Sequence, residues 1–326
     1  MIIDGSYGEG GGQILRTAVA LSAVLGEEVK IKNIRAKRKN PGLRNQHLWG
    51  IKLVAMMTDA KVDGLKIGST MLSFSPGKIR GGEYRIDIGT AGSITLLLQT
   101  SLLPALFADR EVLLDISGGT DVPWSPPVDY YCHVLIPLLR LMEAQIEMDI
   151  IQRGYYPQGG GRVKVKVSPS ELKGIALEDR GNLLARRGYI SLRNLPYHIV
   201  ERMKRTAIGY SFQEDVQNSG RSRGCSILLL NEYEKTIIGA DSLCQKGMRA
   251  EDVALSALEK LKMEESSKAT VDINMGDHLL PFGFLAKGKT FYYVRKVTGH
   301  TKTNAWLVEK FGGKVKIKGG RIEIYA

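Results

Sequence analysis

Three helix-to-strand junctions in this chain follow one pattern, and their spacing limits the folds that the chain can adopt. Apolar helical segments run into Ala60-Lys61-Val62, Ala144-Gln145-Ile146 and Gly313-Lys314-Val315, and alternating strand residues follow each junction. Ala144 lies 84 residues after Ala60 and 169 residues, about twice that spacing, before Gly313. Because repeats of this size usually share a core, we expect three similar units, the third carrying an insertion of nearly one unit's length.

Each unit reads as strand, helix, strand, helix, strand, strand, which predicts an α/β protein built from three βαβαββ repeats. The first helix is expected at 13–25, and strands of the third unit at 270–273 and 290–297. The surplus segment, 183–268, reads as strand (189–192), helix (198–212), two strands and a helix, so it is a small α/β domain in its own right. The repeat-built domain then comprises residues 1–182 and 269–326.

Composition favours a soluble globular protein with a basic surface. A formal net charge of +12 and a pI near 9.5 suit a polyanionic partner such as nucleic acid. No stretch approaches the roughly 20 apolar residues of a membrane helix, and the first residues lack a signal-peptide pattern, so we expect a cytoplasmic protein without membrane contact. Cys132, Cys225 and Cys244 are scattered and odd in number, which suggests neither a disulfide framework nor a zinc site.

A glycine-rich loop with one carboxylate precedes the first predicted helix. The segment 4–16, Asp-Gly-Ser-Tyr-Gly-Glu-Gly-Gly-Gly-Gln-Ile-Leu-Arg, places five glycines around Glu9. Glycines let backbone N–H groups approach a ligand closely, and a helix N-terminus behind such a loop favours anions. Gln13 and Arg16 are three residues apart and share a helix face. The loop predicts a nucleotide or phosphate site; a helix cap with flexible glycines is the alternative.

His300 is the candidate nucleophile. It lies between a predicted strand and a helix in Val-Thr-Gly-His-Thr-Lys-Thr-Asn, where a glycine and small hydroxyl residues leave room for a ligand. A neutral imidazole can attack phosphorus or act as a general base. A histidine beside a helix cap formed by Thr301 or Thr303 is the alternative.

Charged residues in the corresponding loops of other units complete this candidate site. The densest basic cluster includes Arg35 and Arg38, with Gln46 just after it, and arginine forks match phosphate oxygens. Glu9 and Asp277 occupy corresponding first loops, and paired carboxylates beside phosphates suit Mg²⁺. A solvated loop and ordinary turn carboxylates are the alternatives.

Residues 283–290 match the P-loop pattern, Gly-x-x-x-x-Gly-Lys-Thr. That motif needs a strand before it and a helix after it. Here an apolar helix is expected before it and a strand after it, so the match is interpreted as accidental and Lys289 as a solvated charge.

The assembled motifs closely resemble those of RNA 3′-terminal phosphate cyclases. They run in order through nearly the whole chain. The matching segments are 5–16, 34–38 with 41–43, 89–93 running to Gln99, 117–121 with Pro126-Pro127, 156–161, and Gly299-His300 with Thr303-Asn304. The resemblance implies βαβαββ repeats like the C-terminal domain of translation initiation factor 3, plus a smaller inserted α/β domain.

The resemblance also implies a reaction and its residues. An RNA 3′-terminal phosphate would become a 2′,3′-cyclic phosphate at the expense of ATP, through a histidine–AMP intermediate and an RNA-pp-A end, with Mg²⁺ or Mn²⁺ bound. His300 matches the nucleophile. The other implied roles are metal binding for Glu9 and Asp277; phosphate or RNA-end binding for Gln13, Arg16, Arg35, Arg38 and Gln46; and ATP binding for Gln99, Pro126, Asn274, Met275, Gly276, Asp277 and His278.

Three other functions stay open. A non-catalytic branch of this family acts in ribosome assembly and lacks the histidine. Enolpyruvyl transferases use similar repeats without a nucleophilic histidine, and a P-loop NTPase is weakened by the reversed context of its motif. RNA with a 3′-terminal phosphate is the expected partner, and a homodimer is left open.

Overall fold

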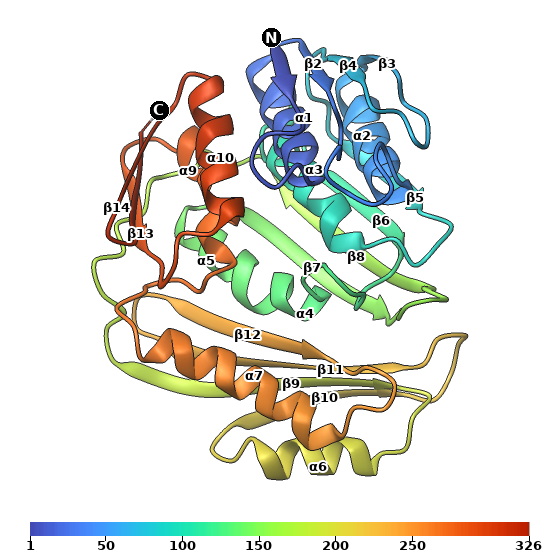
Figure 1. Ribbon diagram of the computed structural model, residues 1–326, viewed down its shortest axis with the longest axis vertical. Coiled ribbons are helices and arrows are strands. Elements are labelled where there is room, and N and C mark those ends of the chain that lie inside the picture. The colour runs from blue at the N-terminus through green and yellow to red at the C-terminus, as the bar shows by residue number, and fades with distance from the viewer. Residues whose placement is uncertain (326) are drawn as a thin grey trace.

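The protein is a mixed α/β structure with four small sheets, described for residues 1–325 by a computed structural model (Figure 1). Both chain ends lie on the same part of the molecule, above the sheet that contains β9 to β12. No helix within residues 1–325 combines the length and the apolar character needed to cross a membrane.

The first two sheets have the same strand order and the same pairing. In each, the first pair of strands is parallel and the other pairs are antiparallel. The first sheet, β1-β2-β4-β3, contains β1 (Ile2–Asp4), β2 (Val29–Lys32), β4 (Leu72–Ser75) and β3 (Lys61–Asp63), with α1 (Gln13–Leu25) and α2 (Asn45–Thr58). The second, β5-β6-β8-β7, contains β5 (Gly82–Asp87), β6 (Val112–Gly118), β8 (Gly161–Ser168) and β7 (Gln145–Gln152), with α3 (Ile94–Leu106), α4 (Val128–Tyr130), the π-turn η1 (Tyr131–Leu135) and α5 (Ile136–Leu141).

The third sheet has three antiparallel strands. It contains β13 (Thr290–Tyr293), β15 (Arg321–Tyr325) and β14 (Lys314–Lys318), in that order, with α8 (Met275–His278), α9 (Leu280–Leu285) and α10 (Gly299–Lys310). The strand predicted at 270–273 is wrong. The buried carboxylate of Asp272 accepts hydrogen bonds from the backbone N–H groups of Asn274 (3.1 Å) and Met275 (3.2 Å), which starts α8 instead.

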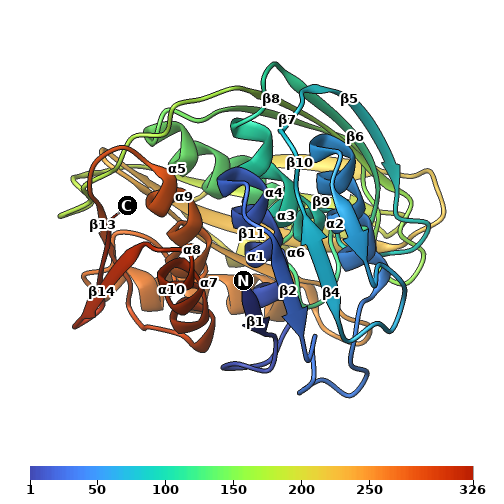
Figure 2. The same cartoon turned by 90° about the horizontal axis from the view of Figure 1, so that it is seen from above.

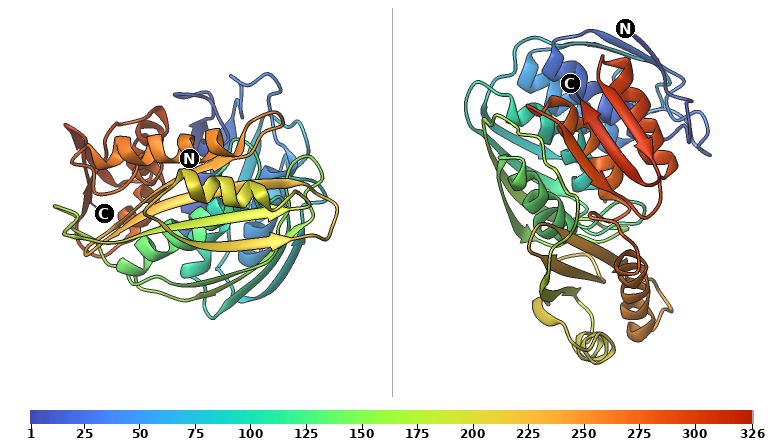
Figure 3. Two further views of the ribbon diagram at one scale, coloured as in Figure 1. Left: turned by 90° about the horizontal axis from the view of Figure 1, so that it is seen from below. Right: turned by 90° about the vertical axis from the view of Figure 1, so that its left-hand side faces the viewer.

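The segment 183–265 forms the fourth sheet and covers one face of it with helices. Its order is β10-β9-β11-β12, from β10 (Ser211–Gln217), β9 (Leu183–Arg193), β11 (Gly224–Tyr233) and β12 (Ile237–Leu243), with α6 (His198–Thr206) and α7 (Ala250–Glu265). The right-hand view of Figure 3 shows α6 (yellow), α7 (brown-orange) and these strands lying apart from the helices of the other sheets. The helix predicted at 198–212 is wrong in its second half, because the chain turns at Gly209 (φ +89°) and continues as β10.

Alternating residues of β11 belong to two hydrophobic cores. Ile227 and Leu229 pack in the core beneath α6 and α7, whereas Leu228 and Leu230 pack in the core of the remaining sheets. Successive strand residues point to opposite faces, so an unbroken apolar run is what a strand buried on both sides requires. The fourth sheet is therefore joined to the rest of the protein through a shared apolar face.

A buried arginine reinforces this junction. Arg153, which follows β7, donates to both carboxylate oxygens of Asp129 (2.6 and 2.8 Å) and to Asp215 of β10 (2.7 Å). A third carboxylate, Asp121, lies 3.6 Å away. Only Asp215 among these side chains is more than 4% exposed.

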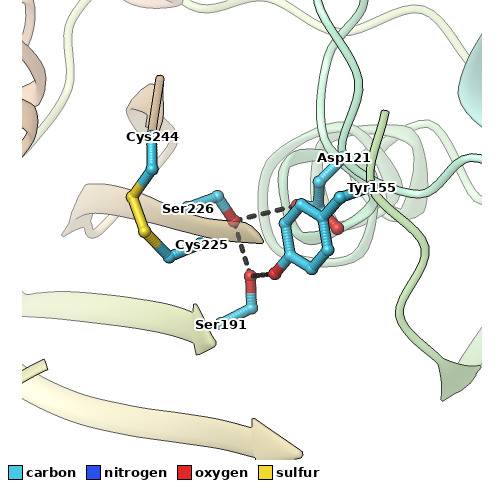
Figure 4. The surroundings of a disulfide bond; sticks show 6 residues. All are labelled: Asp121, Tyr155, Ser191, Cys225, Ser226 and Cys244. Atoms are coloured by element: carbon cyan, nitrogen blue, oxygen red, sulfur yellow. Dashed lines mark hydrogen bonds between the residues drawn. A yellow bond between two sulfur atoms is a disulfide. The ribbon is translucent and has the colours of Figure 1, made fainter. Parts of the chain in front are cut away.

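The sequence suggested no disulfide framework, but two of the three cysteines pair. Cys225 and Cys244 form a disulfide, with their Cα atoms 5.2 Å apart (Figure 4). The pairing of β11 with β12 places them opposite each other, and the Cys244 N–H donates to the Cys225 carbonyl at 2.9 Å. This contact depends on strand register, which spacing in the sequence does not reveal. Cys132 is a free thiol.

The match to the P-loop pattern begins inside helix α9 and ends at the first residue of strand β13, so helix and strand stand in the reverse of the order that the motif needs. Lys289 forms an ion pair with Glu323 at 3.1 Å. The interpretation of this match as accidental is confirmed.

Candidate functional site

Helices α1, α3, α8 and α10 and the strands β11 and β12 surround a cavity of about 900 Å³. Figure 2 shows α1, α8 and α10 lying next to one another. The predicted site residues that line the cavity are Gln13, Arg16, Gln99, Pro126, Asn274, Asp277, His278 and His300. Residues from distant parts of the sequence thus meet at one place.

His300 lies in the first turn of α10, and a hydrogen bond between its Nδ1 and Gln13 orients its ring. Thr298, rather than Thr301 or Thr303, caps the helix by accepting a hydrogen bond from the Thr301 N–H at 3.0 Å. The Gln13 side chain donates from Nε2 to Asp277 Oδ2 (2.7 Å) and to the His300 carbonyl (3.1 Å). Its Oε1 therefore faces His300 Nδ1, at 2.7 Å. An amide oxygen only accepts hydrogen bonds, so Nδ1 carries the proton. Nε2 of the neutral ring then has an unshared electron pair.

The free nitrogen of His300 faces Glu9. Nε2 lies 3.0 Å from Glu9 Oε2, and both groups are about half exposed. Burial, together with Arg16 and Arg38, lowers the pKa of His300, while Glu9 opposes that shift. With a neutral ring, two acceptors face each other, an arrangement that a proton or a bound cation satisfies.

Glycines allow this close approach of the loop to α10. A Cβ on Gly299 would overlap the Glu9 carboxylate, and one on Gly8, at φ +55°, would lie 2.6 Å from Thr303 Oγ1. Tyr7 of the same loop stacks on Trp306 of α10, with ring centroids 4.0 Å apart. The glycine-rich loop is therefore packed onto the first turns of α10.

Asp277 is a buried carboxylate beside this histidine. Burial raises its pKa to about 7, and Arg16 opposes that shift. Asn304 donates to the Asp277 carbonyl (2.9 Å) and accepts from the Thr17 hydroxyl (3.0 Å), which ties α1, α8 and α10 together. Asp277 is therefore held through its backbone carbonyl by α10 and through its carboxylate by Gln13 of α1.

Arg16 brings a buried positive charge to the cavity wall. Its Nε donates to Gln99 Oε1 at 2.6 Å, and burial lowers its pKa to about 10, so it stays charged near neutral pH. His47 has its Nε2 3.5 Å from Arg16 Nη1 and is buried. Burial and the nearby Arg16 lower the His47 pKa well below its ordinary value, so a neutral ring lies beside the guanidinium.

Gly12 is required by this packing. A Cβ at Gly12 would overlap His47 Nε2 and lie 2.9 Å from Arg16 Nη1. We therefore expect Gly12→Ala to lower the free energy of unfolding by about 1–3 kcal/mol, the usual range for overpacking, as measured by urea denaturation. Gly11→Ala is the control, because its Cβ would meet the flexible end of Arg38 at 3.0 Å. Equal stability of the two variants would contradict this explanation.

The remaining predicted phosphate ligands lie beside the cavity. Arg35, at φ +55°, donates from Nη1 to the carbonyls of Asn40 (2.9 Å) and Gly42 (2.8 Å), which fixes its own loop. Arg38 is exposed and lies against the glycine-rich loop. Gln46 accepts from the Ser93 N–H at 3.2 Å. Arg38 is thus placed against the loop that carries Glu9, whereas the Arg35 guanidinium bonds its own loop.

The predicted ATP-binding residues divide into two groups. Asn274 is exposed to the cavity, and the His278 ring, whose pKa burial lowers to about 3, packs edge-on against Tyr131. Met275 is fully buried in the core, and a Cβ on Gly276 would lie 2.7 Å from Val294. Met275 and Gly276 therefore face the core rather than the cavity.

Sequence reasoning missed several cavity residues. Trp124, Tyr156, Arg223 and Lys246 line it, and the disulfide forms part of its wall. The run Pro123-Trp124-Ser125-Pro126 was the available signal, because an aromatic residue among prolines in a loop is poorly placed to join a core.

The residues present fit a divalent cation shared with a phosphate substrate. Within residues 1–325 there is no cluster of three or more His, Cys, Asp or Glu side chains able to hold a metal alone. Mg²⁺ commonly binds through one or two carboxylates plus substrate phosphates. The Glu9 carboxylate faces the unprotonated Nε2 of His300, and its oxygen atoms can coordinate a cation.

The protein is thus an α/β protein in which a histidine, carboxylates and arginines line one cavity. A family model described as RNA 3′-terminal phosphate cyclase matches residues 7–318. The chain belongs to the RNA 3′-terminal phosphate cyclase family and is an enzyme of that type.

Curated relatives of that name are similar over almost their whole length. The protein from Archaeoglobus fulgidus is 46% identical and covers 99% of both chains. The one from Methanopyrus kandleri is 45% identical over 95% of this chain and 92% of its own. The one from Pyrococcus furiosus is 46% identical over 98% and 96%.

Proposed function

We propose that this enzyme converts an RNA 3′-terminal phosphate into a 2′,3′-cyclic phosphate, with ATP as co-substrate. The observation that carries the proposal is the environment of His300 in a chain of this family: its Nδ1–H is bound by Gln13, and its Nε2 lone pair faces the cavity beside Arg16 and Glu9.

In the first step, Nε2 of His300 attacks the α-phosphorus of ATP. The new N–P bond replaces the bond to pyrophosphate, which leaves, and the histidine carries AMP as a phosphoramidate. The ring becomes positively charged as the bond forms, and the Gln13 oxygen stabilises that charge through Nδ1–H. The lowered pKa of His300 keeps the attacking nitrogen unprotonated near neutral pH.

Two further transfers complete the reaction. An oxygen of the RNA 3′-phosphate attacks the phosphorus of the histidine-bound AMP, which breaks the N–P bond and gives RNA-pp-A. The neighbouring 2′-OH then attacks the former terminal phosphorus and loses its proton, and AMP leaves. Arg16, Arg35 and Arg38 would bind phosphate oxygens and stabilise the charge that develops on them, with Gln46 beside them.

The base and the metal have candidate ligands in the same cavity. Pro126 and Asn274 are exposed to it and would contact the adenine of ATP, with Gln99 and His278 beside them. Glu9 and Asp277 would hold Mg²⁺ or Mn²⁺ together with phosphate oxygens; when bound, the ion neutralises phosphate charge. Gln13 acts on the histidine rather than on phosphate in this proposal.

The architecture supports a description as two βαβαββ units and a third that lacks its first strand, with 183–268 inserted as a small domain in a repeat-built domain of 1–182 and 269–326. The identical strand orders of the first two sheets support the repeats. The separate core beneath α6 and α7 supports the insertion.

A phosphatase-resistance assay tests the proposed function. RNA with a labelled 3′-terminal phosphate should become resistant to phosphomonoesterase only with ATP, because a cyclic phosphate is a diester. RNA ending in a 2′-deoxynucleotide is the control, since it lacks the attacking hydroxyl. No resistance with folded protein, ATP and Mg²⁺ would favour the non-catalytic role in ribosomal RNA processing.

We expect Gln13→Ala to lower kcat for adenylylation of His300 about 10- to 100-fold, the usual effect of losing a partner that orients a reactive histidine. KM for ATP should change much less, because Gln13 acts on the nucleophile. Single-turnover labelling over a range of ATP concentrations separates the two constants. A variant that loses ATP affinity at unchanged kcat would instead make Gln13 a phosphate ligand.

A further inference from the structure

Two large aromatic side chains lie exposed at the cavity. Trp124 is 95% exposed and Tyr156 is 63% exposed, and both line the cavity wall. Trp124 also has a φ of +63°, a backbone region that residues with a side chain rarely adopt. Exposed aromatic surface of this kind marks a binding site more often than a random surface position.

The two aromatic residues lie on adjacent, anchored segments. Asp121 and Tyr155 form a parallel bridge, which places the chain leading to Trp124 beside the chain leading to Tyr156. Asp121 accepts from the Ser226 hydroxyl at 2.9 Å, and the Tyr155 and Ser191 hydroxyls lie 2.6 Å apart (Figure 4). The exposed rings therefore project from segments that are fixed to β9 and β11.

Positive charge lies along the same wall. Arg223, at the start of β11, and Lys246, after β12, are exposed and line the cavity. Neither forms an ion pair within the described part of the chain. Aromatic faces combined with cations are how proteins bind single-stranded nucleic acid with little sequence preference.

The cavity must hold two nucleotides at once if the proposed function is right. AMP remains on His300 while the RNA end arrives, so the base of AMP occupies the Pro126 and Asn274 side and the RNA needs separate contacts. A volume of about 900 Å³ is near the upper end for a small-molecule pocket.

Resting on that function, we propose that Trp124 and Tyr156 stack on bases of single-stranded RNA next to its phosphorylated 3′ end. Arg223 and Lys246 bind the backbone phosphates of the same nucleotides. The enzyme then requires an unpaired 3′ end but accepts any base there.

Binding of a fluorescent, 3′-phosphorylated RNA whose last sugar is 2′-deoxy, and so cannot cyclise, tests this directly by anisotropy. Trp124→Ala should weaken binding about 5- to 100-fold, the loss of one stacked base, and Trp124→Phe by no more than about threefold. Ile208→Ala removes an exposed apolar side chain elsewhere and should bind as the wild type does. Equal affinities of Trp124→Ala and wild type would overturn the proposal.

Abasic sites placed singly at the last three positions identify the stacked base. With the abasic site at one of these positions, the difference in RNA affinity between wild type and Trp124→Ala should disappear. A difference in affinity that persists with the abasic site at each of the three positions would overturn the proposal. If Trp124→Ala mainly raises KM for ATP, the aromatic rings contact adenine instead of RNA, and this result would also overturn the proposal. Failure of the proposed function is distinct, because wild-type protein would then form no covalent nucleotide and would not prefer 3′-phosphate ends.

Discussion

His300→Ala is expected to lower the rate of cyclisation at least about 1,000-fold, because it removes the atom that becomes bonded to AMP. The fold should survive, since the side chain is 44% exposed and its loss frees only the Gln13 oxygen. The initial rate of phosphatase resistance, at saturating ATP and RNA, measures the effect.

His198→Ala is the matched control for that experiment. His198 is an exposed histidine at the start of α6, so its removal takes away an imidazole of the same size outside the cavity. Cyclisation by His198→Ala should equal that of the wild type. Substantial cyclisation by His300→Ala would contradict the assignment of the nucleophile.

The second large effect is on stability. Arg153→Ala should lower the free energy of unfolding by about 3–5 kcal/mol, because it leaves the buried Asp121 and Asp129 without their cation. That loss is a large fraction of the stability of an ordinary domain, about 5–15 kcal/mol. Urea denaturation monitored by circular dichroism measures it.

Arg162→Ala provides the comparison. Arg162 forms an equally direct pair with Asp115, but both side chains are partly exposed, and solvent-exposed pairs contribute little. Arg162→Ala should lower the free energy of unfolding by much less than Arg153→Ala does. Similar losses of unfolding free energy in the two variants would mean that burial does not explain the contribution of the Arg153 cluster to stability.

The sequence predicted the bounds of the first helix better than it predicted contacts between distant segments. The helix at 13–25 was predicted with its observed bounds, because an apolar stripe follows a glycine turn. Helix periodicity also placed Gln13 and Arg16 on one face. It could not show that the Gln13 amide meets His300, 287 residues away, since that contact depends on how α1 packs against α10.

Errors arose where tertiary contacts overrode local pattern. Residues 270–273 look like a strand, but buried Asp272 bonds the backbone that follows and starts α8. The helix predicted at 198–212 extends too far, because Gly209 turns the chain after α6 and residues 211–217 pair with β9 as β10. The Cys225–Cys244 bond required the register of β11 with β12.

Hydrophobic periodicity did not reveal the exposed aromatic pair, although the run Pro123-Trp124-Ser125-Pro126 was a signal for Trp124. Periodicity finds residues that share a buried face, whereas Trp124 is in a loop and points away from the core. Its neighbour Tyr156 is brought near only by the bridge between Asp121 and Tyr155.

Incubation of the protein with α-³²P-ATP and Mg²⁺, followed by denaturing electrophoresis, shows whether His300 becomes covalently adenylylated. Wild type should carry an acid-labile, alkali-stable label that is absent from His300→Ala and that passes to RNA with a 3′-terminal phosphate. A folded wild-type protein that binds ATP but takes up no label would contradict the covalent histidine mechanism.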